Sequence, residues 1–426
     1  MPHQAWAETL RERLSFLQDA EVGLSGADQL LWLKRMDDEQ SALQKLARQA
    51  VAAGQLEDAL SITNTLALYW LKRGKLTAGQ RGLTWLLAIP ACERWPILRS
   101  KALLRLGEIL EQQADYWAAE QCLQSALQLA EAHEQLAVAA QALTLLSLIS
   151  FRRGQFAQAQ MQSQQALQQA ELAQDTASQA LALRRLGLSY SASGRATEAG
   201  QCYQESLRLF EALGDVAGQA HTLNNFGSLL MTAGKLPEAQ NLYERALALF
   251  RPLENPLAIA MTLGSLGRLA WFSKQPTVAR DYANEAVLMA REIGVRELLV
   301  LETACLGLAL IDCGEEGYAL FRESLAEARE ADKLTHSPVA LYGIAEMFAR
   351  HGQPHAAVQM LSLLLNQPSL SKMMRPSAER LLEQQRVVLP ASDFDAALTR
   401  GQHFSLTNVI EHILKQSAYE LPTFPA

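Results

Sequence analysis

Apolar residues in this chain follow the spacing of amphipathic helices, and the predicted helices come in closely spaced pairs. Between residues 182 and 190 the apolar positions lie three or four residues apart, which places them on one face of a helix. After Gly194, the apolar positions between residues 199 and 210 show the same spacing. Two helices so close in sequence pack antiparallel. The pattern therefore predicts a helical hairpin as the basic unit.

This hairpin recurs at a nearly fixed interval. The turns between paired helices are 40 residues apart six times and 38 residues apart once, at Gly74, Ala114, Gly154, Gly194, Gly234, Lys274, Gly314 and Gly352. Seven positions before each turn stands a small residue: Ala67, Gly107, Ser147, Gly187, Gly227, Gly267, Gly307 or Ala345. Small side chains suit places where helices cross closely. Because repeats of about 20–50 residues indicate a solenoid, we predict one here.

The repeat predicts an all-α superhelical solenoid of about eight helix pairs, with helical caps at both ends. We expect the solenoid to span residues 60–366. Residues 1–59 form the predicted N-terminal cap, in which 28–53 is one long amphipathic helix. Residues 367–426 form the predicted C-terminal cap and tail. Ser405 is a suitable N-cap for the last helix, because its hydroxyl can accept a hydrogen bond from a backbone N–H of the first turn.

Composition narrows the class of protein further. The 426-residue chain has a net charge of −7, which disfavours direct binding of nucleic acid. It lacks the run of about 18 apolar residues that marks a membrane span, and charged residues stand where a signal peptide needs apolar ones. Its five cysteines are scattered without metal-ligand or redox spacing. We therefore expect a cytoplasmic protein with reduced thiols and no membrane partner.

The sequence contains no catalytic motif, so we predict a protein that is not an enzyme and uses no cofactor. Residues 74–76 and 234–236 lack the upstream glycine and the following Ser or Thr of a phosphate-binding loop, and are repeat turns. His351 and His355 are four residues apart, but Pro354 and a glycine separate them, so they do not share a helical face. We therefore expect no metal site.

The repeated columns resemble the tetratricopeptide-repeat pattern of Leu-Gly, then Tyr, Ala, an aromatic residue and Ala. In the best-matching unit these positions are Leu186, Gly187, Tyr190, Ala199, Tyr203 and Ser206. The period departs from the usual 34 residues, because each unit carries about six extra residues. The resemblance implies that the first helix of each pair lines a concave groove.

By that resemblance, eight residues are candidates for binding a ligand or partner in the groove: Arg152, Arg184, Arg185, His221, Asn224, Asn225, Arg268 and Trp271. Arginine presents a fork of donors to carboxylates and phosphates, and an exposed aromatic ring beside it supplies contact area. Asn224 and Asn225 also begin a run that resembles the asparagine clamp of kinesin light chain repeats. An alternative stays open, in which the arginines pair with acidic residues of neighbouring helices and Trp271 simply packs.

Three stretches resemble a more specific group, the C-terminal repeat region of bacterial STAND-type signalling ATPases and LuxR-type transcriptional regulators. They are the entry at 26–40, the first repeat at 69–90 and the closing segment at 394–414. In that group the region senses inducers or partner proteins and relays to an NTPase switch. The resemblance implies signal transduction and transcription regulation in a bacterium. The chain is then a stand-alone arm, a fragment, or a component that acts with a separate protein.

Two functions of different classes follow. The first is a non-catalytic interaction scaffold that binds a peptide or protein partner along the groove. The second is a sensor arm that binds a small anionic inducer within a STAND-type regulatory system. A peptide groove should stay open along several units, whereas a small-molecule site should gather its arginines and Trp271 in one pocket.

Overall fold

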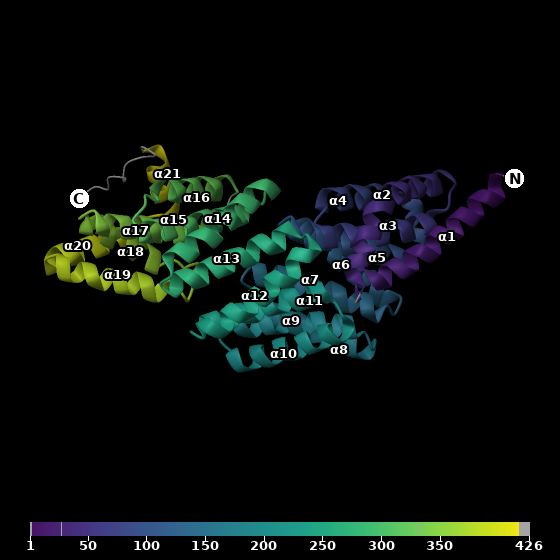
Figure 1. Ribbon diagram of the computed structural model, residues 1–426, viewed down its shortest axis with the longest axis horizontal. Helices are drawn as coiled ribbons and strands as arrows, with labels where there is room; N and C mark the ends of the chain where they lie inside the picture. The colour runs from purple at the N-terminus through teal and green to yellow at the C-terminus, as the bar shows by residue number, and fades with distance from the viewer. Residues whose placement is uncertain (1, 27, 332, 417–426) are drawn as a thin grey trace. The chain divides into compact units, whose positions relative to one another are not determined.

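The computed structural model describes residues 2–26, 28–331 and 333–416. This described part is 84% helical and contains no strand, which confirms the predicted all-α class (Figure 1). Ala27 of the entry stretch and residues 417–426 of the predicted tail lie outside the described residues.

Eight helical hairpins follow one another in the described residues, as the repeat predicts. They are α3 (Leu56–Arg73) with α4 (Leu76–Leu87), α5 (Pro96–Gln112) with α6 (Tyr116–Ala132), α7 (Leu136–Arg152) with α8 (Phe156–Leu172), α9 (Thr176–Ala192) with α10 (Ala196–Leu213), α11 (Val216–Thr232) with α12 (Leu236–Leu253), α13 (Pro256–Phe272) with α14 (Pro276–Ile293), α15 (Arg296–Asp312) with α16 (Tyr318–Glu330), and α17 (Pro338–Arg350) with α18 (Pro354–Leu365). The turns fall at the predicted positions, and α10 runs unbroken through residues 199–212.

Further helices flank the hairpins. They are α1 (Pro2–Gly23) and α2 (Gln29–Ala52) before them, and α19 (Arg375–Val388), α20 (Ala391–Gln402) and α21 (Leu406–Lys415) after them. Two short 3₁₀ helices, η1 (Pro90–Arg94) and η2 (Leu334–His336), lie in connections between hairpins. The helix predicted over residues 28–53 corresponds to α2, and Asp28 stands at its N-cap position.

In each of the eight hairpin turns, the residue at the predicted turn position has a left-handed backbone conformation. The angle φ lies between 69° and 81° at the six glycine turns, and is 62° at Ala114 and 59° at Lys274. In the first turn, the N–H of Lys75 donates to the carbonyl of Trp70 at 2.8 Å, which satisfies a carbonyl at the helix end. Two turns therefore carry a side chain in a conformation that favours glycine.

Small residues before the turns lie where paired helices cross. A Cβ atom placed on Gly187 would lie 2.8 Å from the ring of Tyr203 in α10. One placed on Gly307 would lie 2.6 Å from the ring of Phe321 in α16. These distances are shorter than carbon contacts allow, so the aromatic ring of the second helix occupies the space that a side chain on the first would need. This confirms the close crossing expected from the sequence.

The chain divides into two compact units. Unit 1 comprises residues 1–229 and 245–255, and unit 2 comprises residues 230–244 and 256–426. Successive hairpins pack on one another within each unit, for example α8 on α9 in unit 1 and α14 on α15 in unit 2. The predicted solenoid boundaries at residues 60 and 366 stay a prediction.

In unit 1, the C-terminal end of α3 contacts residues far along the chain. The Nζ atom of Lys72 lies 3.8 Å from Oδ1 of Asp215, which precedes α11. Arg73 donates from Nη1 to the carbonyl of Leu253 at 3.3 Å and to Oε2 of Glu254 at 3.0 Å, just after α12. The first hairpin of unit 1 therefore touches both ends of the fifth.

The C-terminal helices of unit 2 pack against the last hairpin. Phe394 and Ala397 of α20 form an apolar cluster with Val358 of α18. A Cβ on Gly401 would lie 2.2 Å from a backbone carbonyl oxygen of α18, so α20 approaches α18 very closely. Ser405 stands at the N-cap position of α21, as predicted, but its side chain makes no capping hydrogen bond.

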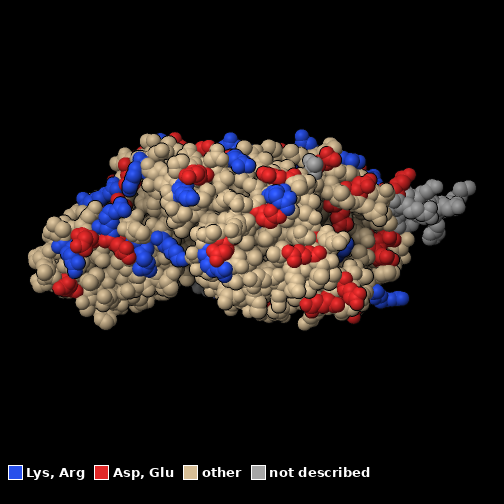
Figure 2. Space-filling model, turned by 90° about the horizontal axis from the view of Figure 1, so that it is seen from below, with Lys and Arg blue, Asp and Glu red and all other residues tan. Residues whose placement is uncertain are grey.

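The surface carries charges of both signs. On the face shown in Figure 2, acidic and basic side chains are interspersed and leave wide neutral areas. Among the described residues, none of the helices is both long and apolar enough to cross a membrane.

Candidate functional site

Two adjacent arginines on α9, in unit 1, have buried Nε atoms. Arg184 is 7% exposed and Arg185 is half-buried, and the Nε atom of each is buried without a hydrogen-bond partner. Among the described residues, neither guanidinium forms an ion pair within 4.0 Å, whereas many other arginines of the chain do. Buried charges in proteins are ordinarily paired, so these two lack the compensation that burial requires.

Other charged groups of unit 1 interact electrostatically with this pair, with His221, or with the carboxylates near the pair. We call the set the inner cluster, and it comprises Lys72, Arg105, Glu108, Glu111, Arg152, Arg184, Arg185, Asp215 and His221. Its members come from α3, α5, α7, α9 and the start of the fifth hairpin. The inner cluster therefore draws on the first helix of each of the first five hairpins.

The three carboxylates of the inner cluster already have cationic neighbours outside α9. The three pairs are Arg105–Glu108 at 3.2 Å (Nη1 to Oε2), Arg152–Glu111 at 3.7 Å (Nε to Oε1) and Lys72–Asp215 at 3.8 Å (Nζ to Oδ1). Each carboxylate is thus nearer to a different cation than to the α9 arginines.

Burial and mutual repulsion lower the pKa values of the α9 arginines. Burial is the largest cause of the lowered pKa of Arg184, and the charge of Arg185 adds to it. Burial likewise lowers the pKa of Arg185, with a further contribution from Arg152. The pKa of His221 falls well below its usual value because of burial and then the charges of both arginines. His221 is therefore neutral at neutral pH, and the surroundings favour an incoming negative charge.

The predicted asparagines lie on the same helix face as His221. Asn224 and Asn225 follow His221 by three and four residues on α11, so the three side chains leave the helix on one side. The Oδ1 atom of Asn224 is buried without a hydrogen-bond donor, and Asn225 is half-buried. Because the two ends of an amide are assigned from their partners, the Asn224 amide can also present its NH₂ group at this point.

Arg268 and Trp271 belong to unit 2, whereas the inner cluster belongs to unit 1. Arg268 donates from Nη1 to Oε1 of Glu302 at 2.7 Å, so it has a partner on α15, the first helix of the next hairpin. Trp271 is 8% exposed and packs with its ring edge-on to Phe272 and Tyr342. The exposed aromatic surface expected at Trp271 is therefore wrong, because α17 covers that side of α13.

Sequence reasoning missed the acidic members of the inner cluster. Glu108 and Glu111 follow Arg105 by three and six residues on α5, so the helical spacing that singled out the arginines could have found them. Lys72 and Asp215 are 143 residues apart, and no periodic signal links them. Arg152 is the most accessible of the predicted arginines in unit 1, with its side chain 45% exposed.

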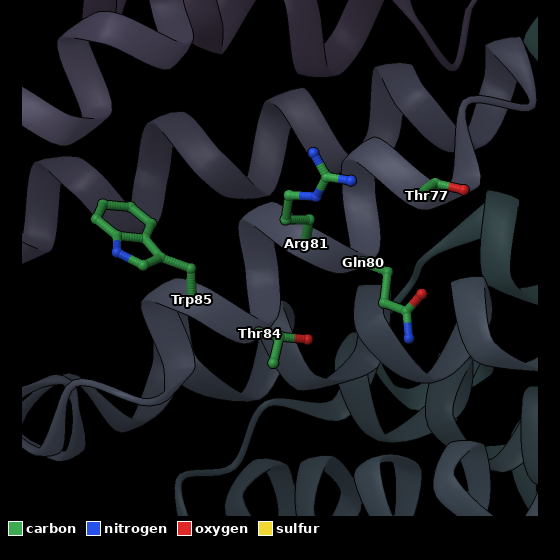
Figure 3. A pocket seen from close by; sticks show the side chains of 5 residues that line it. All are labelled: Thr77, Gln80, Arg81, Thr84 and Trp85. Carbon is green, nitrogen blue, oxygen red and sulfur yellow. The ribbon is translucent and has the colours of Figure 1, made fainter.

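A depression on the outer surface lies elsewhere in unit 1. It is lined by side chains of α4, which Figure 3 shows projecting from one helix: Thr77, Gln80, Arg81, Thr84 and Trp85. Their spacing places them on one exposed face of α4, and Trp85 is 41% exposed. None of the eight residues predicted from the sequence lines this depression.

The described residues give little support for a reactive cysteine or a metal site. Burial raises the pKa of Cys202 to about 11 and that of Cys305 to about 12, which keeps these thiols protonated and poorly nucleophilic. No group of three or more His, Cys, Asp or Glu side chains suited to a metal ion occurs in the part of the chain that the structure describes.

Comparison of the sequence with protein families identifies the repeats. Models described as tetratricopeptide repeat match residues 178–252, 218–292 and 100–133. No match is found among the curated proteins.

Solved structures share the fold at low sequence identity. A Rap protein complexed with competence and sporulation factor is 14% identical, with a TM-score of 0.61 over 86% of this chain and 99% of that one. The apo form of the quorum sensor NprR from B. thuringiensis is 16% identical, with a TM-score of 0.51 over 89% and 99%. A STAND protein with a tetratricopeptide-repeat sensor from Pyrococcus horikoshii is 14% identical, with a TM-score of 0.49 over 88% and 54%. The chain therefore contains tetratricopeptide repeats within residues 100–133 and 178–292, and its fold is a solenoid similar to those of the Rap protein and NprR.

Proposed function

We propose that this protein is a non-catalytic regulatory module that binds a partner protein or peptide through an anionic group received by Arg184 and Arg185. Tetratricopeptide repeats generally serve as interaction modules. The observation that carries the proposal is that the Nε atoms of Arg184 and Arg185 are buried without a hydrogen-bond partner, while neither side chain forms an ion pair among the described residues. A structural role alone does not account for them, because unpaired buried charge destabilises a fold.

The neighbouring groups support an anion as the ligand. The charges of both arginines act on neutral His221, and Asn224 lies three residues later on the same face of α11; both side chains can form hydrogen bonds. The fold is compatible with such a role, since the Rap protein holds competence and sporulation factor on a similar fold. We propose a cytoplasmic signalling role linked to transcription, as the sequence resemblance implies.

A small anionic inducer is the second candidate ligand. It is favoured by one observation: the unpartnered arginines are concentrated in unit 1, whereas Arg268 and Trp271 of unit 2 have partners of their own. A site gathered on a few inner helices suits a compact ligand.

The test is capture of partners from the native host by the tagged full-length chain. We compare the wild type with Arg184→Gln/Arg185→Gln and with the control Arg81→Gln/Arg94→Gln, which removes two exposed charges. The proposal expects a partner that the wild type and the control retain and the α9 variant loses. A small inducer instead appears as a compound of low mass released on denaturing the wild type and the control only.

Two outcomes contradict the proposal. Equal recovery of every partner and compound by the α9 variant removes the arginine pair as the binding site. If only the control variant loses capture, the binding surface is the depression on α4, which Arg81 lines.

A further inference from the structure

The charge balance of the inner cluster points to the kind of anion. Resting on the proposed function, we propose that the group bound by Arg184 and Arg185 carries two negative charges, as a phosphate monoester does. A singly charged carboxylate is the alternative that the experiment below excludes.

The inner cluster has an excess of two positive charges. Five of its members are cations: Lys72, Arg105, Arg152, Arg184 and Arg185. Three are carboxylates, each paired with a cation outside α9, and His221 is neutral. The excess therefore resides on the two α9 arginines, and one dianion balances it.

Burial makes this balance energetically significant. Coulomb interactions are stronger away from water, so a charge left uncompensated beside Arg184 weighs more than the same charge at the surface. A monoanion neutralises one guanidinium and leaves the other repelling its neighbour. A dianion neutralises both.

The donor chemistry of two arginines also suits a phosphate group. Each guanidinium offers a planar fork of N–H donors, and a phosphate monoester offers three acceptor oxygens, so two forks can engage it together. His221 and the Asn224 amide supply further hydrogen-bonding groups on the α11 face. A carboxylate, with two oxygens, satisfies one fork fully and leaves little for the second.

The experiment compares two probes that share a ring and differ in charge. Phenyl phosphate and benzoate are titrated into the full-length protein at pH 8 and constant ionic strength, with binding measured by calorimetry. We expect phenyl phosphate to bind more tightly than benzoate by about tenfold or more, the difference made by one additional charge-assisted hydrogen bond. Arg184→Gln/Arg185→Gln is expected to abolish the preference, and Arg81→Gln/Arg94→Gln to keep it.

The outcomes separate this inference from the function on which it rests. Equal affinity for the two probes, lost in the α9 variant, overturns the dianion and leaves the anion site standing. The protein could also bind neither probe and still capture a partner through the arginine pair. That result likewise overturns the dianion and leaves the anion site standing. Capture and probe binding that both ignore the α9 substitutions overturn the proposed function itself.

A phosphate monoester can belong to a modified protein or to a small metabolite. Extract of the native host is divided by size, and each fraction competes with phenyl phosphate for the wild type. Competition in the large fraction assigns the phosphate to a protein, and competition in the small fraction assigns it to a metabolite. Competition that survives phosphatase treatment of either fraction overturns the phosphate assignment.

Discussion

Arg268 and Glu302 form a buried ion pair between α13 and α15 of unit 2, with Nη1 of the arginine 2.7 Å from Oε1 of the glutamate. Glu302 is 1% exposed, whereas the Arg268 side chain keeps 25% of its surface. Arg268→Ala leaves a buried carboxylate without its cation, so we expect it to lower the free energy of unfolding by about 3–5 kcal/mol. Urea unfolding at pH 7 measures this. A loss below that of an ordinary surface substitution would show that water replaces the arginine.

Replacement of the buried arginine on α9 should act in the opposite direction. Arg184→Met removes a buried charge that has no ion-pair partner among the described residues and fills its place with an apolar side chain of similar length. We expect the free energy of unfolding of the unliganded protein to rise by about 1–2 kcal/mol. Arg268→Met is the matched control and should be destabilising. If Arg184→Met is also destabilising, an unseen partner holds Arg184 and the unliganded site is already filled.

Close helix crossing can be tested with a pair of glycines in the same hairpin. Gly187→Ala places a Cβ against the ring of Tyr203, so we expect it to destabilise unit 1 by about 1–3 kcal/mol. Gly200→Ala in the interior of α10 meets only Leu229, at 4.0 Å, and should stabilise the helix by up to about 1 kcal/mol. Thermal melts of both variants give the answer. Similar melting temperatures would mean that the Tyr203 ring moves aside freely.

Backbone strain at the second hairpin turn makes another prediction. Ala114 has a φ of 62°, a region in which a Cβ costs energy and glycine does not. Ala114→Gly should therefore raise the free energy of unfolding by about 1 kcal/mol, because it relieves the turn. Gly154→Ala, at the equivalent turn with a φ of 76°, should lower it by a similar amount. Chemical denaturation of the two variants should move in opposite directions, and movement in the same direction refutes the strain.

Asp37 provides a prediction that depends on pH. Burial raises its pKa, but hydrogen bonds donated by Tyr69 and Arg73 outweigh that effect and lower the pKa below its ordinary 3.8. A lowered carboxyl pKa stabilises the fold above pH 3.8, and the stabilisation disappears as pH falls through the lower native value. Asp37→Asn should cost about 1 kcal/mol at pH 7, since the site is partly exposed.

The measurement for Asp37 is urea unfolding between pH 7 and pH 3. We expect the difference between wild type and Asp37→Asn to be constant down to about pH 4 and to shrink below it. Asp38→Asn is the control, because it removes an exposed carboxylate and leaves the hydrogen bonds of Asp37 in place. A difference that persists at pH 3 would assign the stabilisation to packing.

Periodicity made the hairpins predictable, because the small residue before each turn lies at the close contact between the two helices of its hairpin. Helices that take no part in the repeat were not identified: α1 and α19 carry no column residue, and only the general expectation of helical caps covered them. The same reasoning placed Arg184 and Arg185 on the first helix of a hairpin, which is α9. It could not decide which arginines have partners, because Glu302 reaches Arg268 from the next hairpin, whereas no acidic side chain of the described residues forms such a pair with Arg184.

The contacts at the end of α3 change how unit 1 can come apart. In an array where each repeat touches only its neighbours, fraying moves inward from a terminus one hairpin at a time. Here Lys72 and Arg73 hold Asp215 and Glu254, so the first hairpin cannot detach without also releasing both ends of the fifth. The described hairpins of unit 1 are therefore linked as a loop and not only as a line. A perturbation at Glu254 reaches Arg73 directly, without passing through the three hairpins that lie between the first and the fifth.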